Sequence, residues 1–453
     1  MSTPLLFSAF VMNTTSHILH GVWREPDARQ IEFNSLDFWV DLAVELEHGL
    51  FDVVFFADVS GLYHEFKGSH RKFVESGLQI PVNDPSAIMS ALAYSTEHLG
   101  LAFTSNVLQE HPFNFARKIS TLDHASNGRI AWNIVTNFQE NGARNFGQNL
   151  TVHDDRYEWA GEYVDVAYKL WEGSWEDDAL RHDRVAGIVS EFGKVHKINH
   201  VGKRYQVEGP HLVTPSPQRT PLLFQAGSSD AGMNFAAANA EVQFITTPHA
   251  EAAASLIAKT RALLPKYQRC AADLKFFQGL SFVVGGSEAE AARKSRELDE
   301  AIDDECMVAH MSGVMGVDLG EYSLDKPLSE ITTDASRSFF DWVTSEVEGR
   351  PATVRDVGRL MQKTTRVVGT PEQIAEQLET WQRAGIDGIN VINGTIPGSY
   401  TEFIAHVMPE LRKRGLAKET YNAGTLRRKI FGVDKLPNNH PAAAYRNAFH
   451  SGC

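Results

Sequence analysis

The sequence has few cysteines and no apolar run long enough to cross a membrane. Its 453 residues include only Cys270, Cys306 and Cys453, none of them in a CxxC pair. Sparse, unpaired cysteines are typical of a reducing compartment and argue against disulfides or a structural zinc site. No stretch approaches the ~18 apolar residues of a membrane span. The apolar stretch near the N-terminus also lacks the preceding basic segment of a signal peptide. We therefore expect a cytoplasmic protein.

Positive charge is also scarce. The chain has 43 Lys and Arg against 57 Asp and Glu, a formal net charge of −14. This balance argues against nonspecific binding to nucleic acid or to an anionic membrane surface, so we expect neither as a partner. The 43% of apolar and 22% of charged residues are typical of a globular protein with a sizeable core. The length fits one large barrel or two ordinary domains.

Several common functional motifs are absent as well. The sequence contains no GxGxxG, no GxxxxGK[ST], no GxSxG and no HExxH. It therefore shows no nicotinamide-binding fold of its own, no obvious nucleophile and no metal site. His17 and His20, in the segment HILH, have neither the spacing nor the strand context of a metal-hydrolase pair.

What the sequence does contain is a series of apolar runs that alternate with helical patterns. The runs are continuous rather than alternating, which indicates strands that are buried on both faces of a parallel sheet. Helix signals lie between them, such as the capping patterns at Ser287 and Thr370 and the Asn127-Gly128 helix end. The predicted strands begin at Leu5, Phe51, Leu99, Arg129, Pro221, Val242, Leu274 and Ile386. Eight such strands favour an α/β fold of the (β/α)₈ TIM-barrel type over a doubly wound open sheet.

Two segments are too long to be simple connections, and the chain continues well beyond the last predicted strand. We expect a single barrel domain over residues 1–414, with insertions at about 171–220 and 306–361. Long insertions of this kind are usually lids or binding loops, and the alternative is that they only pack against the surface of the domain. The C-terminal extension, 415–453, carries apolar and aromatic residues. We expect this arm to pack on the barrel or on a neighbouring subunit.

Polar side chains follow the predicted strands where each strand ends. The strand that begins at Phe51 ends in Asp58, and a flexible Ser60-Gly61 pair follows two residues later. Turn residues are needed at strand ends in any case, but their recurrence around one rim indicates a polar ligand at the active-site end of a barrel. The other positions are Asn13, Thr104, Ser105, Asn106, Thr136, Asn137, Gln225, Ser228, Ser229, Thr246, Thr247, Asn390 and Asn393.

Two of the predicted helices could seat an anion. Gly227, Ser228 and Ser229 precede a helix, where backbone N–H groups, the helix dipole and hydroxyls can hold a phosphate. A plain serine cap is the alternative interpretation. His153 and Tyr157 lie four residues apart near the start of another helix and so share one face. Such a pair alone is more often a core or surface feature than a ligand site.

Several long motifs identify a family. They are VMNTTSHILHGVWREP, FADVSG, QIPVNDP, ARKISTLDHASNGRIAWNIVTN, ARNFG, HDDRYEWAGEY, LWEGSWEDDA, KVHKINHVGKRYQVEGPHL, PSPQRTPLLFQAGSS and PELRKRG. Over nearly the whole chain the sequence resembles the bacterial-luciferase-like flavin monooxygenases, in the subgroup of nitrilotriacetate, dibenzothiophene-sulfone, dimethyl-sulfide and long-chain-alkane monooxygenases. The resemblance implies a two-component system, in which a separate NAD(P)H:flavin reductase supplies reduced FMN. Dioxygen would then react through a flavin C4a-(hydro)peroxide to oxygenate a small organic substrate of organosulfur, alkane, or amine or carboxylate type.

The resemblance also implies roles for particular residues. The FMN site would comprise Asp58, Thr104, Asn137, His153, Tyr157, Ser228 and Ser229, and the catalytic pocket His17, Tyr63, Gln79 and His310. His310 fits a structural helix histidine equally well. The segment 306–361 would be the lid. The sequence departs from the alkane-type enzyme at two positions, with Thr14 where that enzyme has cysteine and Phe138 where it has histidine. These departures leave FMN in place and put an alkane substrate in doubt.

Three functions remain open at this point. The first is the FMNH₂-dependent monooxygenase, expected as a homodimer or homotetramer. The second is a non-catalytic flavin-binding protein of the same fold, which the full set of pocket residues disfavours. The third is a barrel hydrolase with a bound metal.

Overall fold

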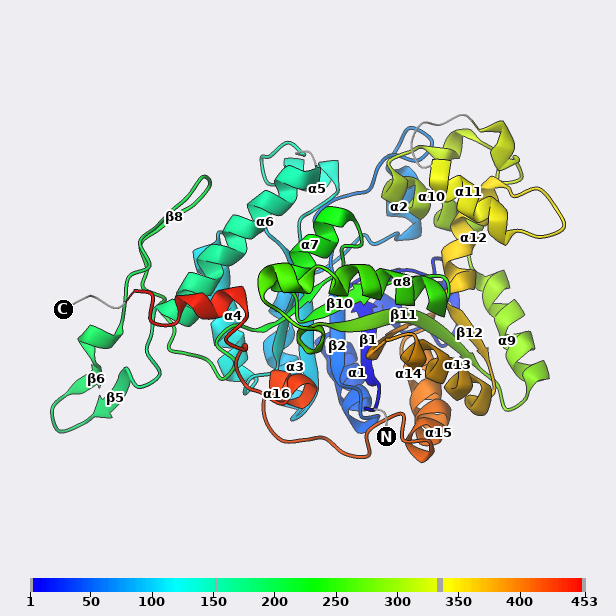
Figure 1. Cartoon of the computed structure of the whole chain (residues 1–453). Helices are drawn as coiled ribbons and strands as arrows, with labels where there is room; N and C mark the ends of the chain where they lie inside the picture. Colours follow the sequence, from blue (N-terminus) through cyan, green and yellow to red (C-terminus); the bar gives the residue numbers. More distant parts are fainter. Residues whose placement is uncertain (1–2, 151–152, 332–336, 450–453) are drawn as a thin grey trace.

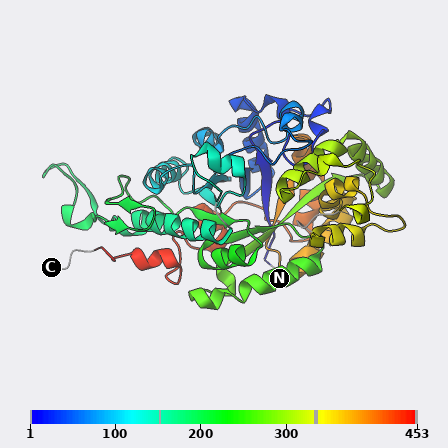
Figure 2. The ribbon, with the colours of Figure 1, turned by 90° about the horizontal axis from the view of Figure 1, so that it is seen from above.

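The computed structural model describes residues 3–150, 153–331 and 337–449 and has a closed parallel barrel at its centre (Figures 1 and 2). Each barrel strand pairs in parallel with two neighbours, and the pairing of β10 with β11 closes the ring. In ring order the strands are β1 (Leu6–Met12), β2 (Val53–Ala57), β3 (Gly100–Asn106), β4 (Ile130–Val135), β9 (Leu222–Gln225), β10 (Val242–Ile245), β11 (Lys275–Val284) and β13 (Gly388–Ile392). They coincide with the eight predicted runs, so the TIM-barrel prediction is confirmed.

Apolar side chains fill the barrel. Phe55 contacts both Phe10 and Phe224, with ring centroids 5.6 and 5.3 Å apart, and Phe277 continues the cluster 5.8 Å from Phe224. All four rings are buried. The interior is therefore a packed core, and a ligand must bind above it, at the carboxyl ends of the strands.

One strand escaped the sequence prediction. β12 (Arg366–Gly369) pairs with β11 from Ser281 to Val284 and takes no part in closing the ring. β11 is ten residues long, and its second half extends past the partners that it has in the barrel. β12 supplies hydrogen-bond partners for the backbone of β11 along this otherwise unpaired edge. β12 has only four residues and comes just after a helix, so its apolar run is too short to be recognised as a strand from the sequence.

Helices surround the barrel and begin and end with the expected signals. Thr370 caps its helix in a complete capping box with Gln373. The helix before β4 ends at Ala125, and Asn127 and Gly128 take positive φ angles of 53° and 80°. The helices in this layer and beside it are α1 (Leu36–His48), α2 (Arg71–Ser76), α3 (Met89–Ser95), α4 (Pro112–Ala125), α5 (Glu140–Asn145), α6 (His153–Tyr168), α7 (Asp230–Asn239), α8 (Ala250–Arg261), α9 (Glu288–Ala301), α13 (Pro371–Arg383), α14 (Gly398–Glu402) and α15 (Met408–Lys413).

The two insertions have different structures. Residues 171–220 form two small hairpins, β5 (Leu180–Asp183) with β6 (Ile188–Ser190) and β7 (His200–Val201) with β8 (Gln206–Val207), which project from the barrel at the left of Figure 1. The insertion predicted at 306–361 falls within the segment of α10 (Asp304–Met315), α11 (Arg337–Glu346) and α12 (Val354–Thr364), so it begins and ends inside helices. These helices share a separate hydrophobic cluster with the segment around Tyr63 and Phe73.

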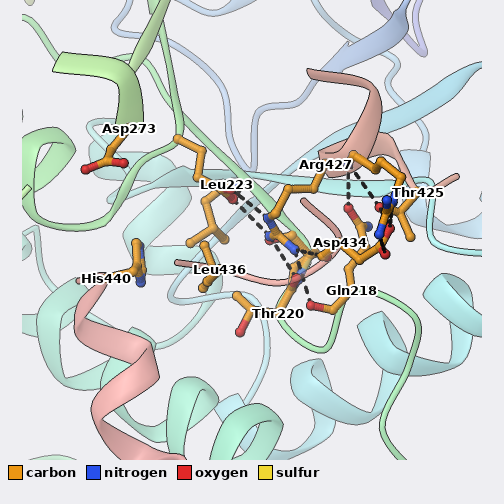
Figure 3. A network of polar contacts seen from close by, with 12 residues as sticks. Gln218, Thr220, Leu223, Asp273, Thr425, Arg427, Asp434, Leu436 and His440 are labelled. Atoms are coloured by element: carbon orange, nitrogen blue, oxygen red, sulfur yellow. Dashed lines mark hydrogen bonds and ion pairs between the residues drawn. The ribbon is translucent and has the colours of Figure 1, made fainter. Parts of the chain in front are cut away.

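The first half of the C-terminal arm packs under the barrel, at the amino ends of the strands, whereas the segment around Tyr445 packs at its side against α6 (Figure 1). α16 (Leu426–Phe431) inserts Leu426 into the barrel core, and the next residue, Arg427, is fully buried. Its guanidinium forms an ion pair with Glu241, whose Oε1 lies 2.6 Å from Nε. It also donates to the carbonyl oxygens of Gln218, Thr220, Pro221 and Asp434 (Figure 3).

No helix among the described residues is long and apolar enough to span a membrane.

Candidate active site

A cavity of about 300 Å³ opens at the carboxyl ends of four neighbouring strands, β2, β3, β4 and β9. It is the place where the strand-end side chains come together. Its lining combines apolar surface with amide, hydroxyl, carboxyl and guanidinium groups. The lining residues are Asp58, Val59, Ser60, Thr104, Asn106, Gln109, Ile134, Val135, Thr136, Asn137, Phe138, Gln139, Arg156, Tyr157, Gln225, Ala226 and Gly227.

Asp58 lies on one wall of this cavity, directly after β2. Burial raises the pKa of its carboxyl group to about 7, and the nearby Asp84 carboxylate adds to the increase. Two hydrogen bonds oppose this increase: Gln109 Nε2 donates to Asp58 Oδ2 at 3.2 Å, and the backbone N–H of Val59 also donates to the carboxyl group. Near neutral pH the group can therefore hold or release a proton.

The opposite wall is a tight turn after β4. Asn137 has a positive φ of 57°, and its side chain bonds both to the N–H of Gln139, at 3.1 Å, and to its carbonyl, at 3.0 Å. Its own carbonyl accepts a 2.7 Å hydrogen bond from Arg156 Nη1. These bonds fix a conformation that leaves the Phe138 ring half exposed beside the cavity.

The third wall joins the first turn of α6 to the loop before α7. The Tyr157 hydroxyl hydrogen-bonds with Ser229, Gln225 and Thr136, while burial raises the pKa of the phenol. Gly227 approaches so closely that a Cβ atom there would lie 2.6 Å from the Tyr157 hydroxyl oxygen and 2.4 Å from Gln225 Nε2. Ser229 caps α7 by accepting from the N–H of Gly232 at 3.1 Å. The cap that we considered as an alternative is thus present, next to the cavity.

Three side chains of the lining have buried polar atoms without a partner among the described residues. They are the donors Gln139 Nε2 and Arg156 Nε and the acceptor Gln225 Oε1. Buried polar groups are usually satisfied, because an unmade hydrogen bond costs about 1–3 kcal/mol. These atoms therefore fit a ligand that both donates and accepts, and that carries negative charge near Arg156. A flavin mononucleotide has these properties.

Sequence reasoning missed Arg156, although a signal was present. Arg156 lies in the first turn of α6, where the helix dipole disfavours a cation. A basic residue at that position indicates a need for positive charge. Gln139 gave no comparable signal.

The four residues expected in the catalytic pocket form a second group, on the far side of Phe138. Tyr63 donates from its hydroxyl to Gln79 Oε1 at 2.7 Å, and Gln79 Nε2 donates to the carbonyl of His17 at 2.9 Å. The Tyr63 ring lies 5.2 Å from the ring of His310 and 5.9 Å from that of Phe138. These residues do not line the 300 Å³ cavity themselves, and Phe138 joins the two groups.

The histidines of this second group are uncharged at neutral pH. Burial lowers the pKa of His17 to about 3 and that of His310 to about 4, and the charge of His310 contributes to the shift of His17. His17 packs its ring 4.7 Å from that of Phe10, at the top of the barrel core. The wall is therefore aromatic and neutral.

The remaining predicted site residues are placed as follows. Thr104 lies in the cavity lining, where its hydroxyl accepts from Asn133 Nδ2 at 2.9 Å. Ser228 is exposed at the start of α7 and is not part of the lining. His153 begins α6, and its side chain lies outside the described residues. No group of three or more His, Cys, Asp or Glu side chains in the described part of the chain could hold a metal ion.

Comparison with known proteins identifies the family of the chain. A family model described as luciferase-like monooxygenase matches residues 12–388. The chain belongs to the luciferase-like monooxygenase family. A dimethyl-sulfide monooxygenase of Hyphomicrobium sulfonivorans is 41% identical over 99% of this chain and 95% of its own. A long-chain alkane monooxygenase of Geobacillus thermodenitrificans strain NG80-2 is 40% identical over 99% of both chains.

A solved structure extends the comparison. A riboflavin lyase crystallised with modified FMN and riboflavin is 35% identical, covers 98% of this chain and 100% of its own, and superposes with a TM-score of 0.89. Members of the luciferase-like monooxygenase family are flavin-dependent, and the two relatives above are named as monooxygenases. This luciferase-like chain is therefore a flavin-dependent monooxygenase.

Proposed function

We propose that the chain binds FMN in the 300 Å³ cavity, receives it in reduced form from a separate flavin reductase, and oxygenates a small uncharged organic compound with dioxygen. The observation that carries this proposal is the set of three unpartnered polar atoms around one cavity, on Gln139, Arg156 and Gln225. Bound reduced FMN would supply the electrons that activate dioxygen.

The residues of the cavity have distinct roles in this proposal. Arg156, Tyr157 and the N-terminus of α7 would hold the phosphate, because they combine a cation, a hydroxyl and the backbone N–H groups of a helix start. Thr104 and Asn137 would contact the sugar chain and the ring. Asp58 would lie beside the ring system, where a carboxyl group with a pKa of about 7 can hold or release a proton. His153 and Ser228 are proposed as further phosphate contacts on the resemblance alone.

The substrate would bind beyond Phe138, against Tyr63, Gln79, His17 and His310. Burial keeps both histidines neutral, and the wall is rich in aromatic rings. Such a surface favours an uncharged molecule over a carboxylate. The dimethyl-sulfide and long-chain-alkane relatives act on compounds of that kind, as their names state. We therefore place the substrate in the organosulfur or alkane class, and Phe138 and Thr14 favour the organosulfur side.

Water exclusion is the other requirement, because oxygen activated at a flavin is lost when water has access. The helices α10 to α12 pack on the Tyr63 segment and cover this side of the site. We propose that they form the lid, and His310 on α10 would then reach the substrate from above.

A binding and turnover assay tests the proposal. The protein is titrated with FMN by fluorescence, then supplied with an NAD(P)H-dependent flavin reductase, oxygen, and a panel of dialkyl sulfides, sulfones and alkanes. We expect saturable FMN binding and oxygen incorporation into at least one sulfur compound. Absence of FMN binding would contradict the cofactor assignment. FMN binding without turnover of any uncharged compound, together with turnover of a carboxylate, would contradict the substrate class.

A further inference from the structure

Three side chains form a hydrogen-bonded row behind the proposed substrate site. Ser16 Oγ lies 2.7 Å from His20 Nδ1, and His20 Nε2 lies 2.7 Å from His310 Nδ1. Ser16 and His20 are almost completely buried, whereas His310 is half-buried. The rings of the two histidines are 4.8 Å apart. His20 is not among the residues that line the 300 Å³ cavity, and its two side-chain hydrogen bonds go to Ser16 and His310.

A hydrogen bond between two neutral imidazoles has a direction. One facing nitrogen carries the proton and the other accepts it, because each neutral ring has one N–H and one lone pair. Both rings here are neutral, since burial lowers the pKa of His310 to about 4 and that of His20 well below its ordinary value. Only two arrangements are then possible, and they differ in which nitrogen of His310 carries its proton.

Ser16 decides between these two arrangements. In the first, its hydroxyl donates to His20 Nδ1, His20 Nε2–H donates to His310 Nδ1, and His310 carries its proton on Nε2. In the second, every bond is reversed, and the Ser16 hydroxyl hydrogen needs another acceptor. Ser16 Oγ has no other hydrogen-bond partner in the described part of the chain. A buried donor without an acceptor is costly, and this cost favours the first arrangement roughly 5- to 150-fold.

We propose that His20 is a positioning residue that, together with Ser16, fixes the proton of His310 on Nε2, so that His310 presents a hydrogen-bond donor to the substrate site. Nε2 has no partner among the described residues, and the ring faces Tyr63. His310 would then stabilise negative charge that develops on oxygen or on a leaving group, and it would not act as a base in its resting form. The catalytic part of this inference rests on the proposed function, whereas the tautomer does not.

The tautomer can be measured without flavin. Nitrogen-15 NMR of the protein with labelled histidine distinguishes protonated from unprotonated ring nitrogens, and loss of a signal pair in His310→Gln assigns His310. We expect Nε2 of His310 to be protonated in the wild type and Ser16→Ala to shift protons toward Nδ1. The matched control is Ser8→Ala, since Ser8 is a buried serine whose hydroxyl makes no hydrogen bond among the described residues. Protonation on Nδ1 in the wild type would overturn the proposal, even if Ser16→Ala failed to fold.

Turnover provides the second readout. We expect His20→Leu to lower kcat about 10- to 100-fold, as losses of orienting partners do, with little change in KM or in FMN affinity. His20→Gln should recover part of this loss, because its amide can donate to His310 Nδ1. Equal activity of His20→Leu and wild type would contradict the positioning role. If wild type binds no FMN at all, the proposed function fails, but the NMR result still decides the tautomer.

Discussion

Two arginines at opposite ends of the barrel differ in how their polar atoms are paired. At the amino end, every guanidinium nitrogen of Arg427 has a partner, and Glu241 neutralises its charge (Figure 3). At the carboxyl end, Arg156 keeps a buried Nε without a partner, and Gln139 and Gln225 have unmade bonds as well. The Arg427 ion pair therefore contributes stability, whereas under the proposed function the three unpartnered atoms of the cavity would bind the ligand. The predictions below test this contrast, beginning with the largest expected effect.

Replacement of Arg427 by methionine should be the most damaging change. It leaves the Glu241 carboxylate buried and unpaired, and such losses typically cost about 3–5 kcal/mol of unfolding free energy. Denaturant unfolding would measure the loss. Arg428→Met is the matched control, because Arg428 is half exposed and its partner Asp434 lies near the surface, so we expect little change in the unfolding free energy. Equal losses for the two variants would show that the buried pair contributes nothing special.

Replacement of Arg156 by methionine should affect binding more than stability. One charge-assisted hydrogen bond contributes about 1.5–3 kcal/mol, so we expect FMN affinity to fall about 10- to 150-fold. FMN fluorescence titration would measure this loss, and denaturant unfolding should show little change. Arg144→Met, on the exposed surface of α5, is the control and should bind as the wild type does. A stability loss as large as that of Arg427→Met would contradict the contrast between the two ends.

Asp58 should make the carboxyl end sensitive to pH. Its folded pKa of about 7 lies above the ordinary value of 3.8, so the folded state holds the proton more tightly than the unfolded state does. The resulting stability is fully present below about pH 4 and is lost as the pH rises through about 7. Because the side chain is only partly buried, we expect a loss of about 1–2 kcal/mol. Asp58→Asn should remove this dependence, which unfolding at pH 5 and pH 8 would show. An unchanged difference between the two pH values would contradict the assignment to Asp58.

A change distant from both ends should have the smallest effect. Phe192, next to the β5–β6 hairpin, is 95% exposed, so Phe192→Ser should change the unfolding free energy by no more than about 0.5 kcal/mol and leave FMN binding unchanged. Denaturant unfolding and FMN titration would check both expectations. A larger loss would show that this projecting hairpin has a partner of its own.

The barrel was predictable because its signal is local. Each strand, such as Val53–Ala57, is an apolar run of a few consecutive residues followed by polar ones, and the helix caps at Thr370 and Asn127 are equally local. β12 was missed because its four residues have meaning only beside the long β11. Within the site, Asp58 and Tyr157 could be named from their positions after a strand and within a helix. Gln139 could not be named in this way. Its Nε2 lacks a hydrogen-bond partner in the described part of the chain because the Asn137 side chain holds the turn in its observed conformation.

The sequence alone determined the fold class, the family and the rim on which the ligand site lies, because apolar periodicity, capping and long motifs are properties of neighbouring residues. Only the tertiary structure decided which distant side chains meet. Arg427 reaches Glu241 across 186 positions, and His20 reaches His310 across 290. No local pattern encodes such pairs, since they arise when the closed barrel brings separate loops together. The charge of the buried Arg427 is neutralised by its distant partner Glu241, and under our proposal the position of the proton on His310 is set by its distant partner His20.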